Sequence, residues 1–298
     1  MNRLPIEKRA QILNLLVEGN SMRATSRIAD VSINTVTKTL VDAGTACLAF
    51  QDEAIRNIAS KRVQCDEIWS FCHSKEKNVA PEDKGVLGYG DVYTWTAIDA
   101  DTKLAISWLV GRRDVEYAEA FIADLASRLQ GRIQLTTDGH GVYVNAIEKA
   151  FGGSVDYAML VKIYEGMGAM DQRRYSPSRF LSADKRRING NPDMGDVSTS
   201  YVERQNLTMR MNMRRFTRLT NGFSKKIENL EHAVALHFMF YNFGRIHKTL
   251  RVTPAMEAGI ADHVWTLEEI AGLVKDEPAK KRGPYKTKAK LSVAEISN

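Results

Sequence analysis

The chain has 298 residues, a formal net charge of +6, 44% hydrophobic and 26% charged residues. These are ordinary values for a globular protein, and no uninterrupted apolar run is long enough to span a bilayer. Three cysteines without a CxxC pair argue against a disulfide framework or a structural zinc site. The N-terminus lacks the apolar block of a signal peptide, so we expect a two-domain cytoplasmic protein with no membrane partner.

The positive charge is concentrated in three segments. Residues 172–187, 204–226 and 278–290 hold 19 basic residues and one acid, whereas the rest of the chain holds 23 basic residues and 35 acids. Each phosphate that such cations neutralise releases condensed counterions. A single run of this kind can be a solvated helix face, but three together favour a polyanionic partner.

Residues 1–46 have the pattern of three short helices. Gly19 ends the first helix, while Ser21 and Ser32 have the side chains of N-caps for the second and third, and Gly44 is the expected end of the third. The turn of ~4 residues between the second and third helices predicts a helix-turn-helix domain. Such a bundle serves protein contacts in some cases. On the DNA-binding interpretation, the residues expected to contact bases or phosphates are Arg23, Arg27, Asn34, Thr35, Thr37 and Lys38.

The middle of the chain alternates strand and helix patterns. We expect a helical linker at residues 47–62 and an α/β domain at 63–262, in which a mixed sheet is flanked by helices. A polar insertion is expected at 164–198. The predicted strands are 62–72, 92–102, 103–111, 132–140 and 155–161, and the predicted helices are 115–131 and 142–152.

Three acids occupy the places where catalysis is expected. Asp66 lies inside the first strand, where a lone buried carboxylate is costly unless it is paired or binds a metal ion. Asp138 ends the fourth strand and precedes a glycine, and Glu203 begins a helix. Each acid alone also has a structural explanation, namely a bulge, an Asp-Gly turn and a helix N-terminus. The nearest competitors are Glu67, Asp91 and Asp99.

The first strand and the end of the fourth should be neighbours, and a later helix can cross both. Asp66, Asp138 and Glu203 would then converge as hard oxygen ligands for two Mg²⁺ ions, with Mn²⁺ as a substitute. Two such ions can promote an in-line displacement at phosphorus. The sequence therefore predicts metal-dependent phosphodiester chemistry.

The runs "CDEIWSF", "TTDGHGVY", "VERQNLTMRMNMRRFTRLTNGFSK" and "YNFGRIHKTLRVTPAMEAG" together resemble the insertion-sequence-one family of bacterial DDE transposases. The resemblance covers about residues 5–260 and implies a ribonuclease-H-like fold. It also implies that Asp66, Asp138 and Glu203 are the catalytic acids. Some members of the family carry an N-terminal zinc ribbon, and its paired cysteines are missing here.

A helix is expected from about residue 199. Glu203, Asn206 and Arg210 would share one face of this helix, next to an apolar stripe. His140, next to Asp138, is an auxiliary candidate that would orient the nucleophile or a phosphate. The predicted DNA contacts of this part of the chain are Arg204, Asn206, Arg210, Arg214, Arg215 and Arg218.

Residues 263–298 are expected to form a short helix followed by a flexible basic tail. Lys281 and Arg282, beside Gly and Pro, resemble a minor-groove arm, although a solubilising tail has the same composition.

The sequence thus favours a transposase that binds terminal inverted repeats and target DNA, works as a dimer or larger homo-oligomer, and associates with the bacterial nucleoid. Two alternatives stay open. One is a DNA-binding regulator that keeps the catalytic fold only as a scaffold. The other is a ribonuclease-H-like nuclease that cleaves without joining strands.

Overall fold

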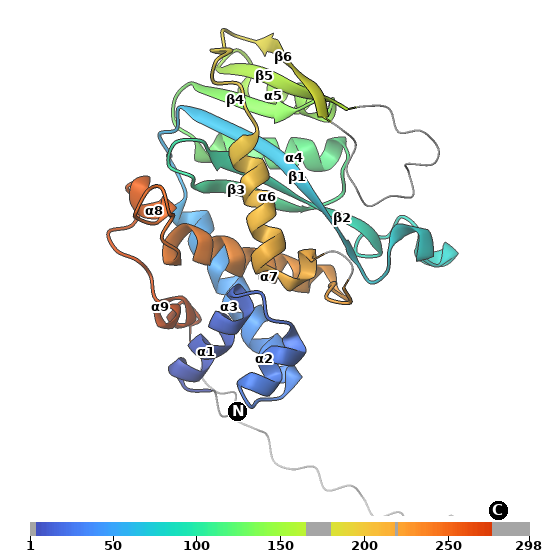
Figure 1. Cartoon of the computed structure of the whole chain (residues 1–298), viewed down its shortest axis with the longest axis vertical. Helices are drawn as coiled ribbons and strands as arrows, with labels where there is room; N and C mark the ends of the chain where they lie inside the picture. The colour runs from blue at the N-terminus through green and yellow to red at the C-terminus, as the bar shows by residue number, and fades with distance from the viewer. Residues whose placement is uncertain (1–3, 165–179, 218–219, 276–298) are drawn as a thin grey trace, which may run out of the picture.

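A computed structural model describes residues 4–164, 180–217 and 220–275 of the chain (Figure 1). It is a mixed α/β protein with a six-stranded sheet flanked by helices. Within these ranges, no helix is both long enough and apolar enough to cross a membrane. The predicted residues Arg218, Lys281 and Arg282 lie outside the described residues, as do most of the basic tail and positions 165–179 of the predicted insertion.

The N-terminal region contains the three helices that the sequence predicts. They are α1 (Ile6–Val17), α2 (Met22–Ile28) and α3 (Ile33–Ala54). The Ser21 hydroxyl accepts a hydrogen bond from the Ala24 amide, and the Ser32 hydroxyl accepts one from the Thr35 amide, so both predicted N-caps are confirmed. Four residues separate α2 from α3.

The predicted end of the third helix at Gly44 is wrong, because α3 continues to Ala54 and occupies half of the expected linker. Gly44 is buried where α3 crosses α7 (Ile227–Met239). A Cβ atom at Gly44 would lie 2.5 Å from the Cβ and 2.7 Å from the Cα of His232. The glycine therefore permits a close helix crossing and does not terminate the helix.

Replacing Gly44 with alanine is expected to lower the free energy of unfolding by ~1–3 kcal/mol, although alanine is the better helix former. The added methyl group would collide with the backbone of α7. Gly141→Ala is the matched control, because Gly141 has a helical φ of −62° and nothing lies within 4 Å of its added Cβ. Urea titrations of both variants measure the effect, and a Gly44→Ala variant as stable as the wild type would contradict the crossing.

The sheet has the strand order β3-β2-β1-β4-β5-β6. The pairs β1–β2, β2–β3 and β5–β6 are antiparallel, while β1–β4 and β4–β5 are parallel. The predicted pairing of the first and fourth strands is therefore confirmed. The strands are β1 (Arg62–Cys72), β2 (Gly90–Asp99), β3 (Ala105–Gly111), β4 (Ile133–Asp138), β5 (Val155–Tyr164) and β6 (Phe180–Asn189).

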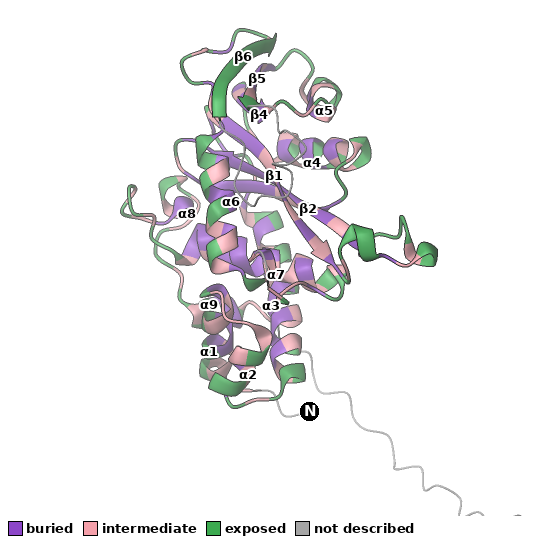
Figure 2. Cartoon of the chain, turned by 45° about the vertical axis from the view of Figure 1, so that its right-hand side comes forward, coloured by how far each residue is buried: buried purple, intermediate pink, exposed green. Residues whose placement is uncertain are grey.

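Helices cover both faces of this sheet (Figure 1). The helices α4 (Val115–Arg128) and α5 (Val142–Phe151) pack together on one face. On the other face, α6 (Ser200–Asn212) crosses β1 and β2, and α7 packs beside it against α3. The central strands are buried between these layers (Figure 2). The shorter elements are the 3-10 helices Glu76–Asn78, Pro81–Asp83 and Arg214–Phe216, the π-helix Phe240–Gly244, and the helices α8 (Pro254–Glu257) and α9 (Leu267–Gly272).

Strand β6 was not predicted, because its residues fall in the expected polar insertion. Residues 180–188 of this edge strand are exposed, so no buried side-chain pattern marks it (Figure 2). Residues 180–189 form a strand because they pair with β5 through backbone hydrogen bonds.

The N-terminal helices are not packed as a separate unit. One cluster of buried side chains includes Leu13 of α1, Leu40 of α3, Phe121 of α4 and Ile270 of α9. The Arg9 guanidinium also donates a hydrogen bond to the Ala271 carbonyl of α9, 3.1 Å away. Residues of the two predicted domains and of the predicted C-terminal helix therefore share one core.

A buried histidine links α6 to α7. The Gln205 side-chain amide donates to Nε2 of His237, 3.2 Å away, and burial lowers the pKa of His237 to about 3. The unfolded chain takes up this proton at its ordinary pKa of ~6.5, so the folded state binds fewer protons between these values. Stability is therefore lost as the pH falls through this window.

We expect the free energy of unfolding of the wild type to fall by up to ~1.4 kcal/mol per pH unit between pH 6 and 4 because of His237. His237→Asn should lack this component of the slope. Urea titrations at several pH values measure the difference, and parallel curves for the two proteins would contradict the assignment.

Candidate active site

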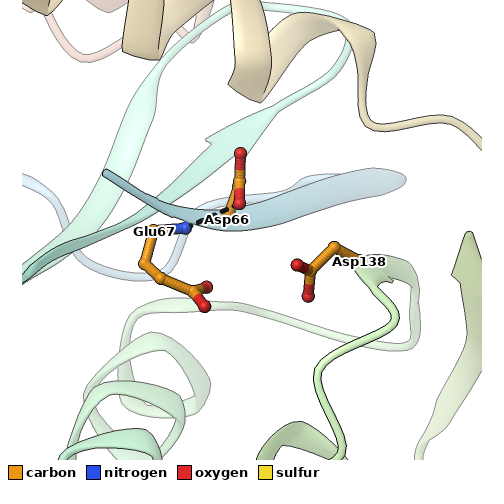
Figure 3. A group of neighbouring side chains, drawn as sticks. All are labelled: Asp66, Glu67 and Asp138. Atoms are coloured by element: carbon orange, nitrogen blue, oxygen red, sulfur yellow. Dashed lines mark hydrogen bonds between the residues drawn. The ribbon is translucent and has the colours of Figure 1, made fainter. Parts of the chain in front are cut away.

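The two acids of β1 leave opposite faces of the sheet. Asp66 is on the face that α6 covers, where the Asn206 side-chain amide donates to Asp66 Oδ2 over 2.9 Å. Glu67 is on the face of α5, where the Tyr143 hydroxyl donates to Glu67 Oε2 over 2.8 Å. The alternation of side chains along a strand dictates this division, and Figure 3 shows the two carboxylates on either side of β1.

Asp138 lies beside Asp66 because their strands are parallel neighbours. Cys65 of β1 is in register with Thr137 of β4, so Asp138 stands next to Asp66 at the end of the fourth strand. The His140 amide donates to Asp138 Oδ1 over 2.9 Å, which fixes this carboxylate in the turn after the strand. The carboxylates of Asp66, Glu67 and Asp138 each offer an oxygen atom within 4.8 Å of the others (Figure 3).

Glu203 is positioned by the start of α6. The Gln64 side-chain oxygen in β1 accepts hydrogen bonds from the Tyr201 and Val202 amides, over 2.9 and 3.2 Å. The first turn of α6 is thereby attached to β1 two residues before Asp66. The Glu203 carboxylate accepts hydrogen bonds from Thr199 and from the Lys162 ammonium group.

The three predicted acids line one open cavity of about 590 Å³. Glu203 is nevertheless not in the compact acid cluster, which contains Glu67 in its place. Two cations also face the cavity, Arg113 and Lys162. The lining residues are Asp66, Arg113, Asp138, Gly139, His140, Leu160, Val161, Lys162, Tyr164 and Glu203.

Glu67 forms an ion pair with Arg113. Its side chain is 1% exposed, and its carboxylate accepts hydrogen bonds from both Arg113 and Tyr143. The same guanidinium reaches Asp138, with Nη2 3.8 Å from Oδ2. Glu67 is thus compensated on its own face, whereas Asp66 and Asp138 open into the cavity.

The burial and crowding of Asp66 affect its pKa. Burial, together with the charges of Glu67, Asp138 and Glu203, raises the pKa of Asp66 to about 7. A divalent cation between these carboxylates would relieve their repulsion, and carboxylate oxygens are the ligands that Mg²⁺ and Mn²⁺ prefer. Asp66 and Asp138, the two members of the cluster that open into the cavity, therefore fit a divalent cation.

Some of the predicted DNA contacts of the N-terminal helices are exposed, whereas others already form hydrogen bonds or ion pairs within the chain. Arg23, Arg27 and Asn34 are exposed. The hydroxyl of Thr35 is hydrogen-bonded to Ser32, and that of Thr37 donates to the Ile33 carbonyl. Lys38 forms an i,i+4 ion pair of 2.7 Å with Asp42.

The predicted DNA contacts of α6 and of the segment after it also differ in exposure and in the hydrogen bonds that they form. Arg204 and Arg214 are exposed, and Arg210 is half-buried. Asn206 is 8% exposed, and its side-chain amide donates a hydrogen bond to Asp66, so it positions that carboxylate. Arg215 is half-buried and donates to the Ser224 hydroxyl over 2.7 Å.

His140 lines the cavity through a packed ring. The ring stacks on Trp95 with centroids 6.5 Å apart and meets Tyr143 edge-on at 6.3 Å. Its Nε2 atom is buried and has no hydrogen-bond partner among the described residues. The ring is therefore fixed by aromatic packing, and the backbone amide of His140 orients Asp138.

Sequence reasoning missed Arg113, Lys162 and Gln64. Lys162 directly follows the predicted fifth strand, and its partner Glu203 is 41 residues away. Arg113 lies in the turn before α4, and Gln64 is a polar residue in a buried strand. The unexpected position of Gln64 was the only available signal, because a buried amide in a strand needs a hydrogen-bond partner.

No protein-family model and no curated protein matches this chain. Among solved structures, it is similar to a piggyBac transposase synaptic complex with hairpin DNA, with a TM-score of 0.40, 10% identity and coverage of 90% of this chain and 70% of that chain. It is also similar to the Mos1 transposase paired-end complex with left transposon end, with a TM-score of 0.23 and 11% identity over 53% of this chain. The chain spans 60% of that Mos1 chain. The function of this chain therefore has to follow from its own residues.

Proposed function

We propose that this protein is a DNA transposase that uses Asp66, Asp138 and Glu203 to cleave and join DNA strands. The supporting observation is that β1, β4 and α6 bring these three carboxylates onto one open cavity. They are 72 and 65 residues apart in the sequence. This arrangement is in line with the ribonuclease-H-like fold that the resemblance implies, as are the first five strands of the sheet order β3-β2-β1-β4-β5-β6.

In this proposal Asp66, Asp138 and Glu203 would hold two Mg²⁺ or Mn²⁺ ions. Bound there, such ions supply Lewis-acid polarisation of the attacking and leaving oxygens in an in-line displacement. Arg113 and Lys162 face the same cavity and offer cations to the non-bridging oxygens of a phosphodiester. Asn206 holds Asp66, and Gln64 holds the start of α6 that carries Glu203.

The reaction we propose has two steps at this site. Water first cleaves a phosphodiester at the element's end, which frees a 3′-hydroxyl and leaves a 5′-phosphate on the flanking strand. That hydroxyl then attacks a phosphodiester of the target DNA, so that a new phosphodiester forms and the target's own 3′-oxygen leaves as a hydroxyl. The helices α1–α3, as a helix-turn-helix domain in residues 1–46, would bind the terminal inverted repeats through the exposed Arg23, Arg27 and Asn34. Two ends must meet, so a dimer or larger homo-oligomer is part of the proposal.

A strand-transfer assay tests the proposal. The purified protein is incubated with Mg²⁺ and labelled duplexes from the DNA on either side of its coding region. Joined products that depend on divalent ions support a transposase. Cleaved but unjoined products indicate a nuclease of the same fold.

One observation favours a second candidate, a DNA-binding regulator. Lys162 pairs with Glu203, and Arg113 pairs with Glu67, so part of the acidic charge is compensated by the chain itself. A regulator would bind the terminal duplex tightly and leave it intact with either metal ion.

A further inference from the structure

A second cavity, of about 750 Å³, lies between the N-terminal helices and the segment that joins α6 to α7. Its basic lining residues come from both parts, Arg23 from α2 and Arg214, Arg215 and Lys225 from the joining segment. Among the described residues that line it there is no carboxylate. The remainder of the wall is largely apolar, with Leu16, Val17, Ile33, Leu40, Met213, Phe223, Ala233 and Leu236.

No carboxylate among the described residues that line the cavity stands beside Arg215. Its guanidinium donates from Nη1 to the Ser224 hydroxyl over 2.7 Å, and its Nη2 lies 3.8 Å from the Met22 sulfur of α2. Both groups are neutral. Burial lowers the pKa of Arg215 to about 10, so the guanidinium is still charged at neutral pH. The half-buried Arg215 is a partly desolvated cation, and a bound anion would lower the cost of this desolvation.

The cavity is held in place by the sheet and by two close backbone approaches. The His73 amide, just beyond β1, donates to the Ser224 carbonyl over 2.9 Å, so the partner of Arg215 is attached to the sheet. A Cβ atom at Gly222 would lie 2.6 Å from the Arg214 carbonyl oxygen. A Cβ atom at Gly19, after α1, would lie 3.2 Å from the Met211 carbonyl oxygen in the last turn of α6.

We propose that this cavity binds a phosphate group, carried by a DNA strand or by a small phosphate compound, and that the ligand fixes the N-terminal helices against the C-terminal end of α6. Four cations without an acid among the lining residues select an anion. The planar guanidinium groups of Arg23, Arg214 and Arg215 match the oxygens of a phosphate, and the apolar wall suits an attached sugar or base.

The position of the cavity gives the ligand a link to the candidate active site. Arg214 and Arg215 follow directly after α6, the helix whose first turn carries Glu203. Arg23 stands on α2, next to Met22, which contacts Arg215. A phosphate that bridges the two sides would therefore hold α6 in place when the N-terminal helices engage DNA, and this DNA source rests on the proposed function.

Binding experiments without divalent ions test the proposal, so that a failure of catalysis cannot be mistaken for a failure of the site. The full chain is titrated with inorganic phosphate against chloride of equal ionic strength, and with a duplex of ~30 base pairs over a range of salt concentrations. Thermal unfolding and fluorescence anisotropy are the readouts. The variants are Arg215→Gln and the exposed Arg23→Gln, with the exposed Lys84→Gln as the charge-matched control.

We expect phosphate to raise the Tm of the wild type and of Lys84→Gln, and to raise that of the two arginine variants far less. If the ligand is DNA, Arg215→Gln should also lower the slope of log K against log salt by ~0.9 more than the control does. Arg23→Gln is compared in the phosphate titration alone, because the proposed function already makes Arg23 a DNA contact. A lost phosphate response with an unchanged duplex slope supports the site and assigns it to a small phosphate compound. Responses equal to those of Lys84→Gln in both titrations would overturn the proposal, and Arg23→Gln keeps the test valid if Arg215→Gln does not fold.

Discussion

Asp138→Ala is expected to lower the rate of DNA cleavage and strand transfer by at least ~1,000-fold, because in the proposed function it removes a ligand of the metal ions, worth several kcal/mol of transition-state stabilisation. Duplex binding should stay within about twofold, since Arg113, the exposed cation that reaches Asp138, is still held by its ion pair with Glu67. Single-turnover cleavage of a labelled terminal duplex and anisotropy titration of the same duplex measure the two effects.

Asp91→Ala is the matched control. Asp91 lies on β2 of the same sheet, opposite Phe71 of β1, and is not among the residues that line the cavity. Its rate should be close to that of the wild type. Equal rates for Asp138→Ala and Asp91→Ala would place the chemistry elsewhere, and an inert wild type that binds the duplex tightly would favour the regulator.

Asp66→Asn is expected to stabilise the protein in the absence of divalent ions by ~2 kcal/mol at pH 8 and to abolish stabilisation by Mg²⁺ or Mn²⁺. The folded chain keeps the Asp66 proton up to a pH of about 7, whereas the unfolded chain releases it near ~4. The wild type therefore loses stability as the pH rises between these values. The neutral amide has no such penalty, so the advantage of the variant should shrink towards pH 4.

The neighbours of Asp66 can accept this change. Asn206 Oδ1 is buried and has no hydrogen-bond partner among the described residues, so a rotated Asn206 amide could accept a hydrogen bond from the new amide group. Urea titrations at pH 5 and 8, with and without Mg²⁺, measure the effect, and Asp91→Asn is the control. A variant that is less stable than the wild type at pH 8, or still stabilised by Mg²⁺, would refute the assignment.

The sequence predicted most elements of the fold, for local reasons. Serine caps and apolar periodicity located α1, α2 and the start of α3, and runs of β-branched residues located β1 to β5. The prediction failed where a residue's role depends on a distant neighbour. Gly44 has the local pattern of a helix end, yet it permits contact with His232. Strand β6 is exposed and has no buried apolar pattern, so its pairing with β5 could not be read from the sequence.

By itself, the sequence determined which acids are candidates. A carboxylate inside a buried strand is costly unless it has a partner, and the other two stand at a strand end and in the first turn of a helix. Only the tertiary structure decided which groups those acids meet. The pleat of β1 separates Glu67 from Asp66, the register of β4 places Asp138 beside Asp66, and the extension of β5 beyond β4 brings Lys162 to Glu203. These are long-range contacts, whose partners are set by strand pairing and helix packing and therefore leave no local pattern in the sequence.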